Sequence, residues 1–368
     1  MANIPLVDLG AQHRQIADEV ARGFAGVFET TSFILGKEVK QFEEAYAAFV
    51  GAKHCVTVAN GTDALEIAVR AAGIGPGDEV ILPTNTFIAS PLAVARAGAT
   101  PIFVDCDPVY YMLDVDQVAA KITPRTRAIM PVDLYGQVAP MEKLEPIARQ
   151  HRLEIVEDAA QAQGAKRNGV GAGTFGMAAG TSFYPGKNLG AYGDGGAVTT
   201  SSDEIAAKLR ALRNYGSEVK YHHPEVGFNS RLDTLQAVVL LAKLKRLAAW
   251  NQARRDAAAR YDQLLGDLPN VTLPRTAAGN ENIFHLYVVR VPKRDEVLKK
   301  LNADGIGAGI HYPVPCHLQG AFKQLGLGVG SFPVAEKAAN EILSLPMFAE
   351  ITADQQARIA DSLRKALA

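Results

Sequence analysis

The sequence predicts an α/β protein: a large domain built on a mostly parallel sheet, followed by a smaller C-terminal α+β domain. From residue 54, short β-rich runs alternate with helical stretches, which is typical of βαβ units. A long helical stretch at 231–267 separates that pattern from a different one after Pro269. The chain has 368 residues, 48% of them hydrophobic, enough for more than one domain. We predict a large domain over 1–240 and a long helix with a small domain over 241–368.

Each element follows from local pattern. Residues 11–50 read as two amphipathic helical segments with a break at residues 30–32. The β-rich runs are 55–59, 79–84, 100–105, 127–136, 153–161, 178–185 and 195–200. Helical stretches follow several of them, at 60–73, 87–98, 141–151 and 203–216. The last part contains a β-rich run at 285–291, a helix near 294–303, the segment 307–314 and a final helix from about residue 352.

Composition narrows the class of protein. The formal net charge is −1, so no global field attracts nucleic acid or an acidic membrane. No apolar run approaches the roughly 20 residues that span a bilayer, and the N-terminal residues lack the pattern of a signal peptide. Three cysteines without CxxC spacing argue against a disulfide framework and fit a reducing compartment. We therefore expect a cytoplasmic protein with no nucleic-acid partner, no membrane partner and no metal site.

The stretch NGTDALEIAV at 60–69 follows a β-rich run and opens a helix. A helix N-terminus carries free N–H groups and roughly half a positive charge, so it can bind phosphate. Asn60, Thr62 and Asp63 are also good helix caps, and capping alone explains them as well. The patterns of a P-loop and of a dinucleotide-binding turn are absent.

The stretch EDAAQAQGA at 157–165 ends another β-rich run. Glu157 and Asp158 therefore lie at the carboxyl end of a strand, where open α/β sheets place their ligands. A carboxylate at the edge of a core needs a cationic partner or hydrogen bonds, and a protonated ring nitrogen on a cofactor would serve. A capping aspartate is the alternative explanation.

Lys187 is the one charged residue in SFYPGKNLG, residues 182–190. An ordinary lysine titrates near ~10.4 and is a weak nucleophile at neutral pH, whereas partial burial makes the amine reactive. Pyridoxal 5′-phosphate needs a lysine for its aldehyde, an acid for its pyridine nitrogen and donors for its phosphate. Lys187, Asp158 and the 60–62 turn together predict such a site, although each is weak evidence alone.

The order of several motifs resembles the DegT/DnrJ/EryC1/StrS family. These motifs are NGTDAL, PTNTFIAS, LYGQ, EDAAQAQGA, SFYPGKNLGAYGDGGA and GFNSRLDTLQA, and the similarity extends from VDLGAQ to SLPM. The resemblance implies an aspartate-aminotransferase-like (fold-type I) protein that uses pyridoxal phosphate, and its pyridoxamine form during turnover, to aminate nucleotide-linked ketosugars.

The resemblance also implies roles for individual residues. Lys187 would form the Schiff base with the cofactor and move the proton, and Asp158 would pair with the pyridinium nitrogen. Further cofactor contacts would come from Gln161 near the phenolic oxygen, Phe87 on the ring face, and Gly61, Thr62 and Ser182 at the phosphate. Asn229 would reach the phosphate of a second subunit, which implies a homodimer with shared sites. A helix cap and a surface charge are the alternative explanations for Asn229 and Arg231.

Other positions bear on the substrate. Tyr184 in YPGK, KYHH at 220–223, NSRLD and HYPVPCHLQ resemble the branch of the family that aminates C3 of dTDP- or UDP-linked 3-ketosugars. The substrate contacts implied are Tyr184, Lys220, Arg231, His311 and Tyr312, whereas ordinary packing explains His311 and His317 equally well. Asp133 stands where many members have histidine, which puts any role of that position in doubt. The presence of Lys187 argues against the related dehydratases, which have histidine there.

The leading hypothesis is transamination of a nucleotide-linked 3-ketosugar, with L-glutamate as donor and 2-oxoglutarate as by-product. A 4-ketosugar or a free cyclitol ketone is the alternative substrate within the same enzyme class. A cofactor-binding regulator without turnover is the alternative outside it.

Overall fold

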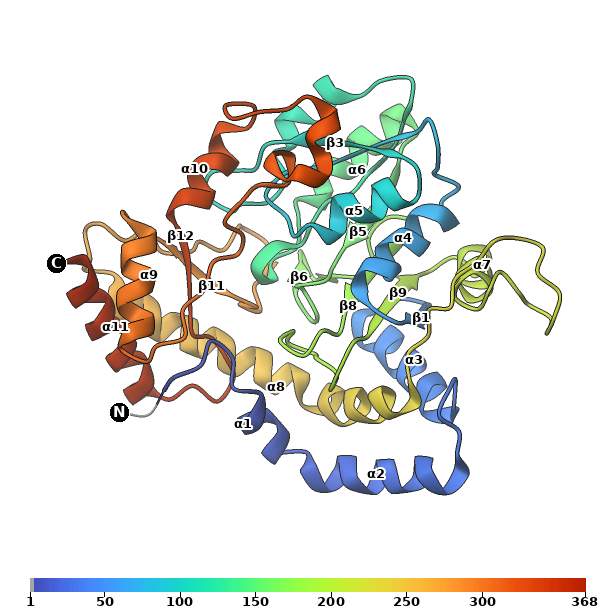
Figure 1. Ribbon diagram of the computed structural model, residues 1–368, viewed down its shortest axis with the longest axis horizontal. Coiled ribbons are helices and arrows are strands. Elements are labelled where there is room, and N and C mark those ends of the chain that lie inside the picture. The colour runs from blue at the N-terminus through green and yellow to red at the C-terminus, as the bar shows by residue number, and fades with distance from the viewer. Residues whose placement is uncertain (1–2) are drawn as a thin grey trace.

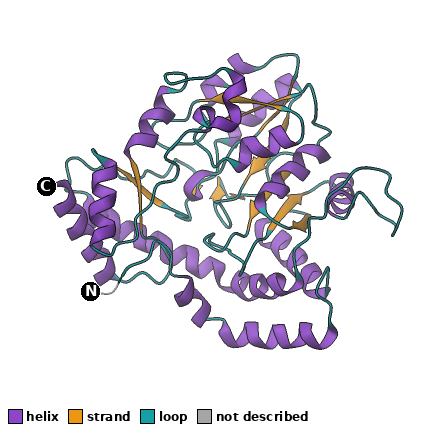
Figure 2. Ribbon diagram, in the orientation of Figure 1, coloured by secondary structure: helices purple, strands orange, loops and turns teal. Residues whose placement is uncertain are grey.

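A seven-stranded mixed sheet occupies the centre of the protein (Figure 1, Figure 2). The computed structural model describes residues 3–368. The strands lie in the order β1-β9-β8-β5-β4-β2-β3, and only β9 runs against the others. Their bounds are β1 (His54–Val58), β2 (Glu79–Pro83), β3 (Thr100–Val104), β4 (Thr126–Ile129), β5 (Glu154–Asp158), β8 (Ala178–Ser182) and β9 (Gly196–Thr200). The mostly parallel sheet is confirmed, although the strand expected over 127–136 ends at Ile129.

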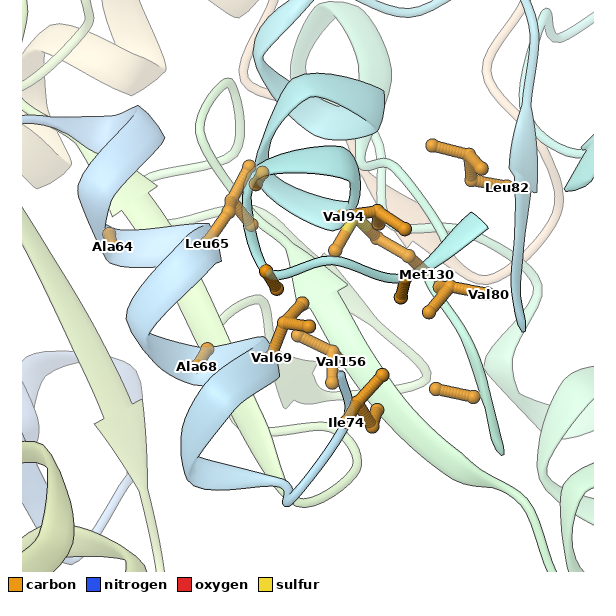
Figure 3. Packing of buried hydrophobic residues seen from close by; sticks show 14 of the residues in the cluster. Ala64, Leu65, Ala68, Val69, Ile74, Val80, Leu82, Val94, Met130 and Val156 are labelled. Atoms are coloured by element: carbon orange, nitrogen blue, oxygen red, sulfur yellow. The ribbon is translucent and has the colours of Figure 1, made fainter. Parts of the chain in front are cut away.

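Helices cover both faces of this sheet, so most residues of its strands are buried. They are α4 (Gly61–Ala71), α5 (Ala89–Arg96), α6 (Met141–His151) and α7 (Asp203–Arg213). Figure 3 shows Val69 of α4 beside the sheet residue Val156, in one apolar cluster with Ala64, Leu65 and Ala68. This approach needs the small residue Gly180 of β8, since a Cβ there would lie 2.7 Å from Leu65 Cδ2. The N-terminus of α4 is thereby held close to the end of β8.

The N-terminal part packs on one long helix. The helices are α1 (Leu9–Arg14), α2 (Ala17–Thr30), α3 (Lys37–Val50) and α8 (Thr234–Leu265), and both α2 and α3 contact α8. Two segments were expected before residue 50, but Asp8 caps an additional short helix by accepting from Ala11 N at 2.8 Å. The break lies at residues 31–36, where Thr31 and Leu35 have φ of 51° and 52°. Figure 1 shows α8 running from below the large sheet to the C-terminal elements.

The C-terminal elements enclose a second core. They are α9 (Arg294–Ala303), α10 (Pro333–Glu341), α11 (Ala353–Leu367) and the antiparallel pair β11 (Tyr287–Arg290) and β12 (Ile342–Leu345). Residues from the second half of α8 and from β11, β12, α9 and α11 form one apolar cluster, which also includes Ile4. Segment 307–314 is irregular, with a single bridge from Gly309 to Ser344. Helix α8 is continuous through residue 240, so no linker marks the predicted domain boundary. The division into two domains stays a prediction.

Short elements complete the fold. A small sheet joins β10 (Asn280–Glu281), β6 (Lys166–Arg167) and β7 (Val170–Gly171). Short 3-10 helices are η1 (Val115–Gln117), η2 (Ala119–Lys121), η3 (Leu134–Gly136), η4 (Cys316–Leu318) and η5 (Gly320–Leu325). Within residues 3–368, no helix combines the length and apolarity needed to cross a membrane. The same residues hold no metal-ligating cluster of His, Cys, Asp and Glu, and the three cysteines are buried and free.

Candidate active site

The strand ends and one helix N-terminus meet at the carboxyl edge of the large sheet. Strands β5 and β8 are parallel and aligned with Asp158 opposite Gly180, so Asp158 and Ser182 lie at the same edge. Gly61, the first residue of α4, touches this edge: a Cβ on it would lie 2.6 Å from Ser182 Cβ. Only glycine therefore leaves room between the helix and the strand end.

The N-terminus of α4 is capped by Asn60 and has N–H groups that no helix bond uses. Asn60 is extended at φ −163°, and its Oδ1 accepts from Asp63 N at 2.8 Å. The first intrahelical donor is Ala64, whose N–H bonds Asn60 O at 3.0 Å. The N–H groups of Gly61 and Thr62 precede it and are available to a ligand. The capping interpretation was therefore correct for Asn60, and it leaves room for the phosphate-binding one.

Asp158 is buried, with 4% of its surface exposed. Its Oδ2 accepts from Ser90 Oγ at 2.6 Å and its Oδ1 accepts from Ala160 N at 3.1 Å. Burial raises the pKa of this carboxyl, while Ser90, Ala160 and the charge of Lys187 oppose that rise. A second cation at this carboxylate would stabilise its ionised form.

Lys187 lies in the loop that follows β8, and its backbone N donates to Tyr184 O at 2.8 Å. Burial lowers the pKa of its amine from 10.5 to about 8, against a smaller opposing effect of Asp158. A substantial share of the amine is therefore neutral, and nucleophilic, near pH 8. The structure brings together Lys187, Asp158 and the N-terminus of α4, the three groups that the sequence singled out.

A ring of aromatic and amide groups lies beside them. Gln161 Nε2 donates to Tyr312 Oη at 3.1 Å, and Gln161 Oε1 accepts from Tyr135 N at 2.8 Å. The ring centroids of Tyr312 and Phe87 lie 5.2 Å apart, and Phe87 is 48% exposed. Tyr135 donates its hydroxyl to His311 O. Phe87, Gln161 and Tyr312 therefore belong to one side of the site.

His311 lies on the same side, and its Nδ1 is 2.8 Å from Ser344 Oγ. Burial and the nearby Lys187 lower the pKa of His311 to about 4. This imidazole is therefore neutral at physiological pH. His317 lies apart, between Thr84 Oγ1 at 2.7 Å and Glu336 Oε1 at 3.1 Å, as expected for a packing residue.

The remaining predicted residues face outward. Tyr184 lies in the same loop as Lys187, and 61% of its surface is exposed. Asn229 is exposed and accepts from Arg231 Nη2, and the Arg231 guanidinium lies 5.4 Å from the centre of the Tyr215 ring. Lys220 Nζ contacts the Tyr221 ring at 4.9 Å. These last residues belong to the segment between α7 and α8, which projects from the body in Figure 1.

Asp133 is not a surface or ligand-facing residue. It is fully buried, its Oδ1 accepts from Ala139 N at 2.8 Å, and it shares a hydrogen bond with Glu157. Burial, followed by the charge of Glu157, holds the pKa of Asp133 well above its usual range. Two hydrogen-bonded carboxyls require a proton between them, so Asp133 serves as a neutral donor to Glu157. Glu157 in turn accepts from Gly173 N and Phe175 N.

Sequence reasoning missed residues that support the site. Ser90 bonds Asp158 across 68 positions of sequence, and His285 lies 3.1 Å from Asn188, the neighbour of Lys187, across 97 positions. A serine in the stretch PTNTFIAS and a histidine before an apolar run carry no local signal of such pairing. They could be found only once the sheet order was known.

Comparison with known proteins agrees with this geometry. Residues 14–364 match the model of the DegT/DnrJ/EryC1/StrS aminotransferase family. The chain belongs to this family. Its fold is matched by the crystal structure of S. venezuelae DesV in complex with a ketimine intermediate. The TM-score is 0.97 with 45% identity, over 99% of this chain and 98% of that one. The predicted aminotransferase fold is thereby confirmed.

Several family members are similar over nearly the whole chain. A pleiotropic regulatory protein of Geobacillus stearothermophilus is 48% identical over 98% of each chain. A UDP-N-acetyl-3-dehydro-alpha-D-glucosamine 3-aminotransferase of Acidithiobacillus ferrooxidans is 47% identical over 99% of this chain and 98% of its own. A dTDP-3-amino-3,4,6-trideoxy-alpha-D-glucose transaminase of Streptomyces venezuelae is 46% identical over 98% of this chain and 96% of its own.

Proposed function

We propose that this family member is a pyridoxal-phosphate-dependent aminotransferase that converts a nucleotide-linked 3-ketosugar to the 3-aminosugar. The observation that carries the proposal is the amine of Lys187, with its pKa lowered to about 8, at the strand edge it shares with Asp158 and the α4 N-terminus. Relatives named as UDP- and dTDP-sugar 3-aminotransferases support the position of amination. L-glutamate is the proposed amino donor.

The residues present fit pyridoxal phosphate. Gly61 allows the N-terminus of α4 to lie against Ser182, because a Cβ on it would come within 2.6 Å of Ser182 Cβ, and the adjacent N–H groups suit a phosphate. Asp158 is a buried carboxyl whose bonds to Ser90 and Ala160 leave it without an immediate cationic neighbour other than Lys187. A protonated ring nitrogen would supply the missing positive charge. The lysine, the acid and the cradle therefore match the three polar parts of this cofactor.

The proposed mechanism assigns each residue one task. Bound pyridoxal phosphate supplies an electron sink that stabilises negative charge at the carbon bearing the transferred nitrogen. Asp158 would keep the pyridine nitrogen protonated, and Gly61, Thr62 and Ser182 would hold the phosphate. Lys187 Nζ, partly neutral near pH 8, would remove the proton from the Cα of the amino donor and carry it to the other side of the transferred nitrogen. Tyr312 and Phe87 exclude water from one side, while Tyr184 and His311 contact the sugar.

We further propose that two chains complete each site. The segment between α7 and α8 carries Asn229 and exposes Tyr215, Val219, Tyr221 and Val226, with 45%, 64%, 80% and 93% of their surfaces accessible. Apolar side chains on a projecting segment are typical of a surface covered by another chain. In this arrangement Asn229, Arg231 and Lys220 act in the partner's site.

Mixing two inactive variants tests the shared site. Lys187→Ala lacks the amine, and Asn229→Asp places a carboxylate against the phosphate of the other chain. If sites are shared, a mixed dimer has one intact site, and an equimolar mixture regains roughly a quarter of the unmodified activity. An inactive mixture that still forms mixed dimers would contradict the shared site.

Substrate position is tested by amination assays with L-glutamate. Matched 3-keto and 4-keto sugars, each linked to dTDP or UDP, are compared with a free cyclitol ketone. We expect amination of a 3-keto nucleotide sugar, and its loss in Lys187→Ala. Amination of only the 4-keto sugars or the cyclitol would overturn the substrate. A chain that binds the cofactor and aminates none of them would favour a regulator.

A further inference from the structure

A chain of buried polar side chains lies directly behind Lys187. Gln163, Asn188, Asn251 and His285 come from four separate parts of the sequence, and each has 8% or less of its surface exposed. Asn251 Nδ2 donates to Gln163 O at 2.9 Å, Asn188 Nδ2 donates to Asn251 Oδ1 at 2.9 Å, and His285 Nδ1 lies 3.1 Å from Asn188 Oδ1. No part of the proposed mechanism uses these four residues.

One end of this chain is anchored on the two strands that carry the site. Gln163 Nε2 donates to Ala160 O at 3.1 Å, to Thr181 Oγ1 at 3.0 Å and to Ser182 O at 2.9 Å. Ala160 lies two residues after Asp158 and donates its N–H to that carboxylate, and Ser182 is a proposed phosphate contact. The other end reaches Asn188, the residue after Lys187. These hydrogen bonds therefore connect the neighbourhoods of Asp158, Ser182 and Lys187 through Asn251 of α8.

Backbone carbonyls fix the direction of every hydrogen bond. Gln163 O and Ile283 O are acceptors only, so the groups that face them, Asn251 Nδ2 and Asn188 Nδ2, must be the amide nitrogens. Asn188 Oδ1 is then the atom that faces His285, and it can only accept. His285 must therefore carry its proton on Nδ1 and be an acceptor at Nε2.

The surroundings keep this imidazole neutral. Burial holds the pKa of His285 well below its usual range, and the positive charges of Lys187 and Arg254 act in the same direction. The groups that face the Lys187 amine are Asp158 from β5 and the neutral His285 and His311 from the C-terminal part. A neutral histidine at this place adds no charge that would compete with Asp158.

We propose that Asn188, Asn251 and His285 are positioning residues for Lys187, and that His285 acts through its Nδ1–H rather than as an acid or base. The inference rests on the proposed function only in that Lys187 is the reacting amine. The hydrogen bonds among these side chains hold the loop after β8 in place. The Lys187 amine thereby stays desolvated and at a fixed position relative to Asp158. Removing these hydrogen bonds lets water reach the Lys187 amine.

The test measures the pKa of the Lys187 amine in the cofactor-free chain. Acetic anhydride is applied at a series of pH values, and peptide mass spectrometry follows modification of Lys187 against that of exposed lysines. His285→Asn keeps a donor where Nδ1 was, whereas His285→Gln moves the amide to the place of Nε2 and loses that donor. Asn251→Leu removes the central link at similar volume.

We expect the pKa of Lys187 to be about 8 in the unmodified chain. His285→Gln and Asn251→Leu should raise it by about 1 unit or more towards the ordinary lysine value. His285→Asn should leave it unchanged, since the bond to Asn188 is kept. Gln356→Ala is the matched control, because Gln356 is a buried amide that bonds Ala257 O and Arg260 in the C-terminal core. It should lower the melting temperature and leave the pKa of Lys187 as it was.

Two results would overturn the inference. One is an unchanged Lys187 pKa in folded His285→Gln and Asn251→Leu. This result would mean that the hydrogen bonds among these side chains only stabilise the fold. The other is an equal shift in His285→Asn and His285→Gln, which would mean that the Nδ1–H donor does not position the amine. Neither result depends on turnover, so failure of the proposed transamination is seen separately, in the assay with glutamate and ketosugar.

Discussion

Substitution of Gly61 by alanine tests the cradle at the start of α4. The added Cβ would lie 2.6 Å from Ser182 Cβ, whereas ordinary contacts begin near 3.4 Å, so helix and strand must separate by about 0.8 Å. Overpacking of this kind costs about 1–3 kcal/mol, and a gain of about 0.5–1 kcal/mol in helix propensity offsets part of it. We expect a net loss of about 1–2 kcal/mol in the free energy of unfolding.

The same substitution moves the N-terminus of α4 away from Ser182, and both are proposed to hold the phosphate. Urea unfolding of the cofactor-free chain gives the stability change, and titration with pyridoxal phosphate gives the affinity, which should fall at least about tenfold. Gly26→Ala in α2 is the matched control, because a Cβ there meets nothing within 4 Å. It should be neutral or slightly stabilising and bind the cofactor normally. If Gly61→Ala behaved like Gly26→Ala in both assays, the proposed phosphate site at the N-terminus of α4 would be contradicted.

Three further substitutions test separate parts of the structure. Ser90→Ala removes a bond that lowers the pKa of Asp158. As pH falls, cofactor binding measured by titration should therefore be lost at a higher pH than in the unmodified chain; an unshifted profile would contradict this role. Asp133→Asn keeps a neutral donor to Glu157 and should change stability by less than about 1 kcal/mol, whereas Asp133→Leu should cost about 1–3 kcal/mol by urea unfolding. Equal losses would show that the carboxyls share no proton. Arg254→Met leaves the carbonyls of Phe284 and Met347 without their donor and should cost about 2–4 kcal/mol by calorimetry, with a small loss counting against the assigned bonds.

Residues that follow strands could be predicted from sequence because their place depends on local pattern. Asp158 ends the apolar run of β5, and Gly61 opens the helix after β1, so both were placed before the sheet order was known. Lys187 followed from the same reasoning, since its stretch begins at the end of β8. Parallel strands bring such ends to one edge whatever the order of the strands.

Contacts across long sequence separations could not be predicted. Asn188 and Asn251 are 63 positions apart, and only the packing of α8 beneath the Lys187 loop brings them together. Element β12 was missed because a four-residue run gives too little pattern. Helix α10 did carry a signal, a proline at its first position, which sequence reasoning overlooked. The role of Asp133 could not be predicted, because it depends on a proton shared with Glu157 and no residue pattern shows such a proton.

The most direct test of the central claim is an absorbance spectrum of the purified chain with pyridoxal phosphate, recorded before and after excess L-glutamate. We expect the visible band of lysine-bound pyridoxal phosphate, its replacement by the spectrum of the pyridoxamine form after glutamate is added, and release of 2-oxoglutarate. Lys187→Ala should lack the initial band. A band that ignores glutamate would contradict the proposed donor, and no band at any cofactor concentration would contradict the assignment of Lys187 itself.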